Sequence, residues 1–175
     1  LKTVGAQHAG AWRIAGGAMA RLDLDKHAIA AMTHAQNLEP THAPGWFNLG
    51  SVQQRSALVN EALASYRRAV EADSTYAKAA EKMAALAEEH GRIEAYMEAA
   101  RLLLQMDGEH VIGEAYATML LQLAQGESDV MDQVAGLPPT LPAGPEMARE
   151  ALTIMSRGEG SGLITVSYTH LTLPT

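Results

Sequence analysis

Apolar residues recur along the first 125 residues at intervals of three and four, which is the spacing of one face of an amphipathic helix. The first stripe holds Trp12, Ala15, Gly16 and Met19. Turn residues and prolines separate such stripes, and no alternating strand pattern competes with them in this part of the chain. The pattern therefore predicts seven helices, over residues 9–22, 26–37, 44–55, 59–72, 75–90, 94–105 and 111–124.

Local signals place several helix ends. Pro40 cannot continue a helix, so it ends the second one, whereas Pro44 fits the first turn of the third. Asp73 and Ser74 are expected to cap the helix at 75–90, and Gly91 is expected to end it in the left-handed conformation.

Beyond residue 125 the pattern changes. Four prolines make residues 137–145 a linker, a helix is expected at 146–158, and residues 159–165 form a Gly-rich break. Residues 166–175 resemble the in-frame translation of a sequencing-library adaptor, and we expect them to be non-native. Residues 1–8 are expected to end a preceding helix or linker. Because the chain starts at Leu1, we expect a fragment of a longer protein.

The helical stripes repeat every 34 residues without an insertion. The frame aligns four pairs of positions: Trp12 with Trp46, Ala28 with Ala62, Met32 with Tyr66, and Ala35 with Ala69. A third copy is in phase, but Tyr96 and Ala100 exchange the small and large positions. Gly16 and Gly50 also share a frame position. Glycine inside a helix costs about 1 kcal/mol relative to alanine, so its recurrence predicts a close approach between helices.

These features resemble the tetratricopeptide repeat (TPR) family, in particular Trp46-x-x-Leu49-Gly50 followed by the small and large positions of the second helix. The resemblance implies an all-α fold, a right-handed α-solenoid of antiparallel helix pairs. The expected units are residues 9–42 (unit 1), 43–76 (unit 2) and 77–110 (unit 3, degenerate). Residues 111–136 are either a partial fourth unit or a capping helix.

The resemblance also implies a binding groove lined by the first helix of each unit. In the family, one such groove is a carboxylate clamp that holds acidic C-termini with basic and asparagine side chains. The clamp positions that match in this sequence are Arg13, Asn48, Lys78 and Lys82, whereas Gly17 departs from the pattern. Phe47, Ser51, Gln54 and Arg55 are expected on the same wall, with Phe47 as an apolar anchor.

Each of these residues has a structural alternative. Asn48 occupies a position where asparagine is common in the repeat, and Lys78 and Lys82 can belong to a solvated helix face with Glu81 beside them. Phe47 can instead pack between adjacent units.

Composition and charge exclude several functions. A net charge of −7 argues against a general nucleic-acid surface, and the absence of cysteine excludes disulfides and thiolate metal sites. No apolar run is long enough to cross a membrane. His27 and His34 could share a helical face, but no third His joins them at helical spacing and Asp23 is expected in the turn, so we expect no metal. We expect no cofactor and no catalysis, because no nucleophile, phosphate loop or carboxylate pair stands out.

The sequence therefore favours a protein-interaction scaffold that binds a peptide or partner subunit in the groove, with an acidic C-terminus as one candidate ligand. Two alternatives stay open. The repeats could be the N-terminal region of a larger bacterial enzyme of the sulfotransferase or glycosyltransferase type, or an assembly factor of an envelope or secretion complex. The cytoplasm is the favoured compartment, although any leader would lie upstream of Leu1.

Overall fold

The computed structural model describes residues 8–125, and within the last helix it describes side chains up to residue 120. The described residues form helices and turns without a strand, which confirms the predicted all-α fold. The helices are α2 (Ala9–Arg21), α3 (Asp25–Leu38), α4 (Ala43–Arg55), α5 (Val59–Ala72), α6 (Ala77–Glu89), α7 (Ile93–Met106) and α8 (Gly113–Gln125). Each predicted helix agrees with an observed one to within two residues at either end. The segments predicted at 1–7, 126–136, 137–145, 146–158, 159–165 and 166–175 lie outside the described residues.

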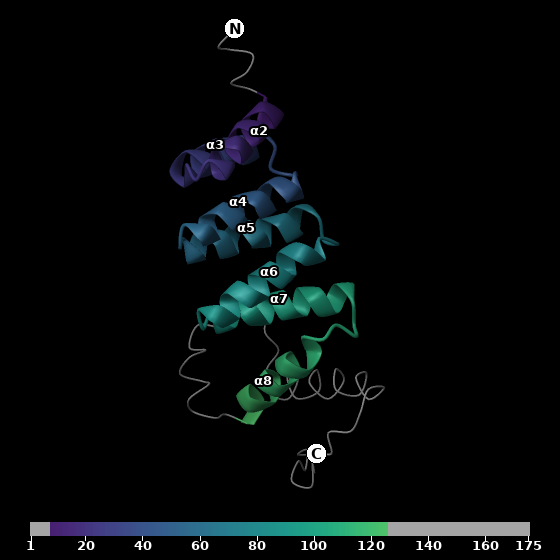
Figure 1. The fold of residues 1–175 in the computed structure, drawn as a ribbon. Helices are drawn as coiled ribbons and strands as arrows, with labels where there is room; N and C mark the ends of the chain where they lie inside the picture. Colours follow the sequence, from purple (N-terminus) through teal and green to yellow (C-terminus); the bar gives the residue numbers. More distant parts are fainter. Residues whose placement is uncertain (1–7, 126–175) are drawn as a thin grey trace.

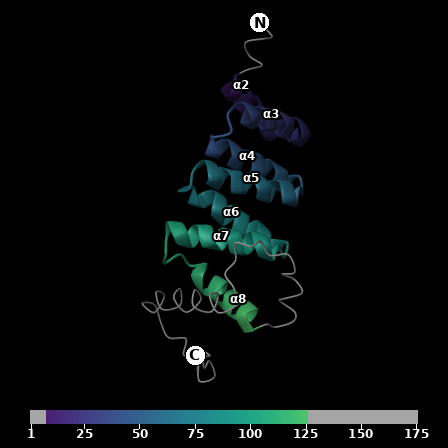
Figure 2. The same cartoon turned by 180° about the vertical axis from the view of Figure 1, so that it is seen from behind.

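The helices stack in a row in the order of the sequence (Figure 1). Within the described residues, extensive contacts join α2 to α3, α4 to α5 and α6 to α7, which are the helix pairs of units 1, 2 and 3. Further contacts join α3 to α4 and α5 to α6, and α8 packs more lightly on α7. The view from behind shows the same open row (Figure 2). Packing in which extensive contacts join consecutive helices defines an α-solenoid of antiparallel helix pairs rather than a closed bundle.

The two frame-equivalent glycines lie where the helices of a unit touch. A Cβ atom added at Gly50 would lie 2.8 Å from ring carbons of Tyr66, and one at Gly16 would lie 2.6 Å from Cγ of Met32. Tyr66 is fully buried, so its ring has no room to retreat. The predicted close approach is confirmed in units 1 and 2. In unit 3 the frame places Ala84 at the position of Gly50 and Ala100 at the position of Tyr66. Because Ala100 is smaller than tyrosine, the methyl group of Ala84 has room.

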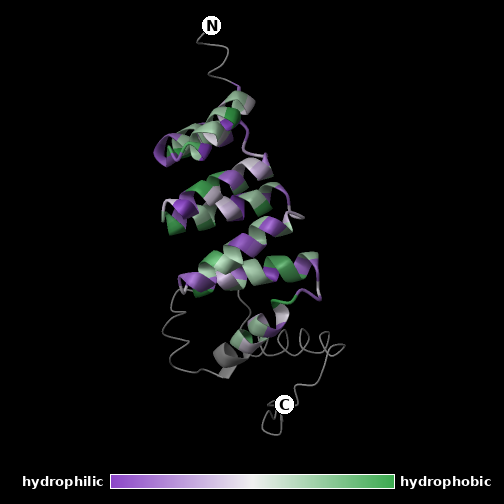
Figure 3. Ribbon diagram, viewed as in Figure 1, coloured by the Kyte–Doolittle hydropathy of each residue, from purple (hydrophilic) through white to green (hydrophobic). Residues whose placement is uncertain are grey.

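One core runs through the three units, built mainly from alanine and a few large side chains. Apolar and polar residues alternate along every helix, as the colours of Figure 3 show. The two frame-equivalent tryptophans differ in burial. Trp46 is buried in the core, with the guanidinium of Arg68 4.9 Å from its ring centroid. Trp12 lies in unit 1, at the end of the described row, and is only partly buried, with the ring of His34 4.8 Å away.

The turn inside each unit uses a left-handed residue at the same frame position. Gly91 has φ +61°, which confirms the predicted helix end, and Asp23 (φ 56°) and Ala57 (φ 59°) occupy the equivalent positions in units 1 and 2. Glycine adopts this conformation freely, whereas other residues are strained there. Units 1 and 2 therefore hold a strained turn that unit 3 avoids.

The predicted cap of α6 is wrong. The residue preceding α6 is Tyr76, and no side chain caps the helix there. Asp73 instead accepts hydrogen bonds from the backbone N–H (3.0 Å) and the hydroxyl (2.7 Å) of Thr75. Aspartate competes for nearby backbone donors in this way and stabilises a turn rather than a helix start. Asp107, at the same frame position in unit 3, makes the same bond to the N–H of Glu109.

Candidate peptide-binding surface

The predicted site residues all lie on the first helix of a unit. They are Arg13 on α2, then Phe47, Asn48, Ser51, Gln54 and Arg55 on α4, and Lys78 and Lys82 on α6. Asn48, Lys78, Lys82 and Arg55 are exposed, whereas the other four are partly buried. Exposure alone does not identify the free side chains, because Arg55 is exposed and also contacts unit 1.

Lys78 and Lys82 lie one helical turn apart on α6. The ion pairs found among residues 8–125, at N–O distances of 4.0 Å or less, include neither lysine. Both side chains are exposed, and the four-residue spacing sets them on the same face of the helix. Together they offer two ammonium groups that can donate charge-assisted hydrogen bonds to an acidic ligand.

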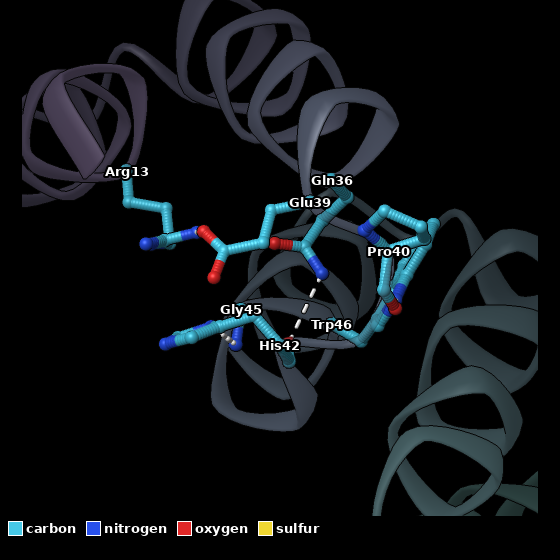
Figure 4. A network of polar contacts seen from close by, with 7 residues as sticks. All are labelled: Arg13, Gln36, Glu39, Pro40, His42, Gly45 and Trp46. Carbon is cyan, nitrogen blue, oxygen red and sulfur yellow. Dashed lines mark hydrogen bonds and ion pairs between the residues drawn. The ribbon is translucent and has the colours of Figure 1, made fainter. Parts of the chain in front are cut away.

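Arg13 is already engaged inside unit 1. Its Nη1 atom lies 2.7 Å from Oε2 of Glu39, in the loop that follows α3 (Figure 4). The hydrogen bond and the charge of Arg13 hold the pKa of the Glu39 carboxyl below its usual value. Arg13 would therefore have to share or leave this partner to bind a ligand carboxylate.

The same loop is fixed by three more side chains (Figure 4). Gln36 Nε2 donates to the carbonyl oxygen of His42 at 3.1 Å, His42 Nδ1 accepts from the N–H of Gly45 at 2.9 Å, and Trp46 Nε1 donates to the carbonyl oxygen of Pro40 at 2.8 Å. These bonds come from α3 and α4, so they join units 1 and 2. The periodicity of apolar residues did not reveal them, because every group in the network is polar.

Gln36 is the weak point of that network. The residue is almost fully buried, yet its Oε1 atom has no hydrogen-bond partner. A Cβ atom added at Gly45 would lie 2.1 Å from this oxygen, so the glycine makes room for the amide. At the junction of units 2 and 3, the frame equivalent of Gln36 is Val70 and that of Gly45 is Ala79, and both are buried and apolar. The junction of units 1 and 2 is therefore polar where the next junction is apolar.

Arg55 also links units. Its Nε lies 3.0 Å from Oδ2 of Asp25, at the start of α3, and its Nη2 donates to the carbonyl oxygen of Ala20 at 2.8 Å. A second bond joins Nη2 to Oδ1 of Asp25. The side-chain hydrogen bond from Arg55 lowers the pKa of Asp25. Arg55 thus binds the turn of unit 1 to the end of α4, and a guanidinium near the last carbonyls of α2 also complements that helix dipole.

Phe47, Ser51 and Gln54 gather around Tyr66. The Tyr66 hydroxyl donates to Gln54 Oε1 at 2.8 Å, and burial raises the pKa of this phenol. The Ser51 hydroxyl donates to the backbone oxygen of Phe47 at 3.0 Å. The ring centroid of Phe47 lies 5.7 Å from that of Tyr66 and 5.7 Å from that of Tyr76. Phe47 therefore packs against two aromatic rings of its own unit, one of which, Tyr76, is the residue that precedes α6.

A second link between units was not predicted. Arg67 on α5 binds both carboxylate oxygens of Glu98 on α7, with Nε 2.6 Å from Oε1. The hydrogen bond that Arg67 donates to the Glu98 carboxylate raises the pKa of Arg67. The partners are 31 positions apart in the sequence, which is outside the helical spacings that single-sequence patterns detect.

Other kinds of site receive no support in the described region. In residues 8–125, no three His, Cys, Asp or Glu side chains come close enough together to hold a metal ion. The helices of this region also lack the length and apolar content that a membrane crossing requires.

No protein-family model matches the sequence, and no curated protein sequence matches it. Solved structures do resemble the fold. A crystal structure of MamA has a TM-score of 0.52 at 16% identity, over 87% of this chain and 81% of that one. A second MamA crystal structure gives 0.51 at 17% identity, over 91% and 80%. The MamA RS-1 ArsTM double mutant gives 0.51 at 15%, over 89% and 79%. At these identities the likeness concerns the fold alone, which is that of a TPR-type α-solenoid.

Proposed function

We propose that the protein is a protein-interaction scaffold that binds an acidic peptide segment of a partner along α2, α4 and α6. The observation that carries this proposal is the pair Lys78 and Lys82, exposed one turn apart and without an ion-pair partner among the described residues. In solenoids of stacked helix pairs, extended surfaces of this kind bind peptides. The protein as a whole carries a net charge of −7, so a local pair of cations gives the acidic ligand a defined place to bind.

The proposed site is smaller than a full carboxylate clamp. Gly17 lacks the side-chain amide that the clamp has at this position, and Arg13 forms an ion pair with Glu39. Asn48, Lys78 and Lys82 therefore supply the polar contacts, and each exposed charge contributes modestly because water and salt screen it. We expect micromolar rather than nanomolar binding. The enzyme and assembly-factor alternatives stay predictions.

A peptide titration tests the proposal. Fluorescence anisotropy of a labelled peptide that ends in several Asp and Glu residues should report binding to the parent. It should report roughly tenfold weaker binding to Lys78→Ala and to Lys82→Ala, the loss expected for one charge-assisted hydrogen bond. Lys26→Ala, an exposed lysine on α3, is the matched control. Equal affinity for the parent and both α6 variants, or equal loss in the control, would refute the proposal.

A further inference from the structure

The first helices of the three units present one side chain each at the same frame position: Ile14, Asn48 and Lys82. All three are exposed. Ile14 is 75% exposed, although it lies in the middle of α2, and every other strongly exposed large apolar residue of the described region lies in a turn or at a helix end. The row therefore changes along the stack from apolar in unit 1, through neutral in unit 2, to cationic in unit 3.

A second row of positions, four residues earlier in each helix, changes in the same direction. It holds Gly10, Pro44 and Lys78, of which the last two are exposed. The cationic end of both rows is unit 3. Arg13 is next to Ile14, but its charge is paired with Glu39, so the unit 1 end of the two rows stays apolar.

The helix on either side of Ile14 is open at Gly17 and covered only by ordinary side-chain contacts at Gly10. Gly10 precedes it by one turn, and Gly17 follows it by three residues. A Cβ atom added at Gly17 would meet nothing within 4 Å, and one at Gly10 would meet only side-chain atoms, the nearest at 3.7 Å. Glycines on both sides of an exposed isoleucine allow another chain to approach the helix backbone closely. The packing inside unit 1 explains Gly16, which Met32 covers, but not these two.

We infer that the bound segment is amphiphilic and lies in one orientation, with its acidic residues over Lys78 and Lys82 and an apolar side chain against Ile14. This inference rests on the proposed function and adds the apolar contact and the direction to it. Burial of the isoleucine side chain favours binding, whereas the lysines select the acidic end. Helix layers lie about 8–10 Å apart, so two units separate the ends by roughly 20–40 Å, which an extended peptide spans with about 6–12 residues.

The test uses synthetic peptides with a leucine separated from an Asp/Glu cluster by 6, 9 or 12 residues, titrated against the full chain. Ile14→Ser should weaken binding of the best peptide roughly fivefold to tenfold. Ile14→Ser should not change the affinity for a control peptide in which serine replaces the leucine. The matched control is Val111→Ser, an exposed apolar residue in the turn before α8. Equal affinity of the parent and Ile14→Ser for the leucine peptide would overturn the inference, and a dependence on Lys78 and Lys82 alone would still leave the proposed function standing.

Orientation can be measured directly because the chain contains no cysteine. Single cysteines at the exposed positions Ala11 on α2 and Ala85 on α6 can each carry a fluorescent acceptor. A donor at the leucine end of the peptide should transfer energy more efficiently to the label at residue 11. Higher transfer to residue 85 would overturn the inferred direction, whereas absence of binding by every acidic peptide would refute the proposed function itself.

Discussion

Replacing Gly50 by alanine tests how closely the helices of a unit approach each other. The added methyl group would lie 2.8 Å from two ring carbons of Tyr66, whereas ordinary contacts of such atoms begin near 3.4 Å. The ring is fully buried and its hydroxyl is hydrogen-bonded to Gln54, so it cannot turn away without a loss. Gly17→Ala is the matched control, since its methyl group would meet nothing within 4 Å.

Two opposing terms set the expected size of the effect. Alanine gains about 1 kcal/mol over glycine inside a helix. Overpacking a well-filled core costs about 1–3 kcal/mol, and the rigid ring places Gly50 in the upper part of that range. We therefore expect Gly50→Ala to lower the free energy of unfolding by about 1–2 kcal/mol. We expect Gly17→Ala to raise it by about 1 kcal/mol, because only the first term applies.

Urea unfolding followed by circular dichroism at 222 nm measures both effects, with thermal unfolding as a check. For a chain of this size 1 kcal/mol corresponds to a shift of about 2–4 °C in Tm. Opposite signs in the two variants support the reasoning. If Gly50→Ala stabilised the protein as much as Gly17→Ala does, Tyr66 would have room to move, and the tight interface of unit 2 would be refuted.

Three further substitutions have expected outcomes. Gln36→Met should raise the free energy of unfolding by about 0.5–2 kcal/mol. It loses one hydrogen bond, but it removes a buried oxygen that has no hydrogen-bond partner. A lower free energy of unfolding in urea would mean that this oxygen does have a hydrogen-bond partner. Ala57→Gly should stabilise by about 0.5–1 kcal/mol by relieving φ 59°, and lower thermal stability would contradict the strain. Asp25→Asn should destabilise the fold at pH 7 but not near pH 2. Arg55 lowers the pKa of Asp25, so the Asp25 carboxylate stabilises the fold above about pH 4, and this stabilisation is lost as the pH falls through the lowered pKa. Urea unfolding across pH checks this, and a difference from the parent that is constant with pH would contradict the linkage.

The fold could be predicted from sequence because its determinants are local and repeated. Helical stripes depend on residues three or four apart, and the 34-residue frame aligns Trp12 with Trp46 and Gly16 with Gly50. Even the left-handed turn residues follow this frame, since Asp23 and Ala57 align with Gly91. The same frame aligns Ile14 with Lys82, so the change from apolar to cationic side chains along the first helices also follows from the sequence.

The links between units could not be predicted in this way. Arg55 meets Asp25 and Arg67 meets Glu98 across 30 and 31 residues, which are separations that helical spacing does not detect. A charged residue on a helix surface carries no local sign of which distant partner it will meet. For the same reason Arg55 was predicted to face a ligand, whereas in the structure it holds unit 1 against unit 2.

The packing of each helix mainly on the next one in the row also has a mechanical consequence. Because extensive contacts join only consecutive helices in residues 8–125, a small change of angle at each junction adds to the next, and the ends of the row can move apart while every helix stays intact. The row should therefore stretch elastically under tension. A partner bound across several units would stiffen it, so that force applied to the chain and occupancy of the surface would influence each other.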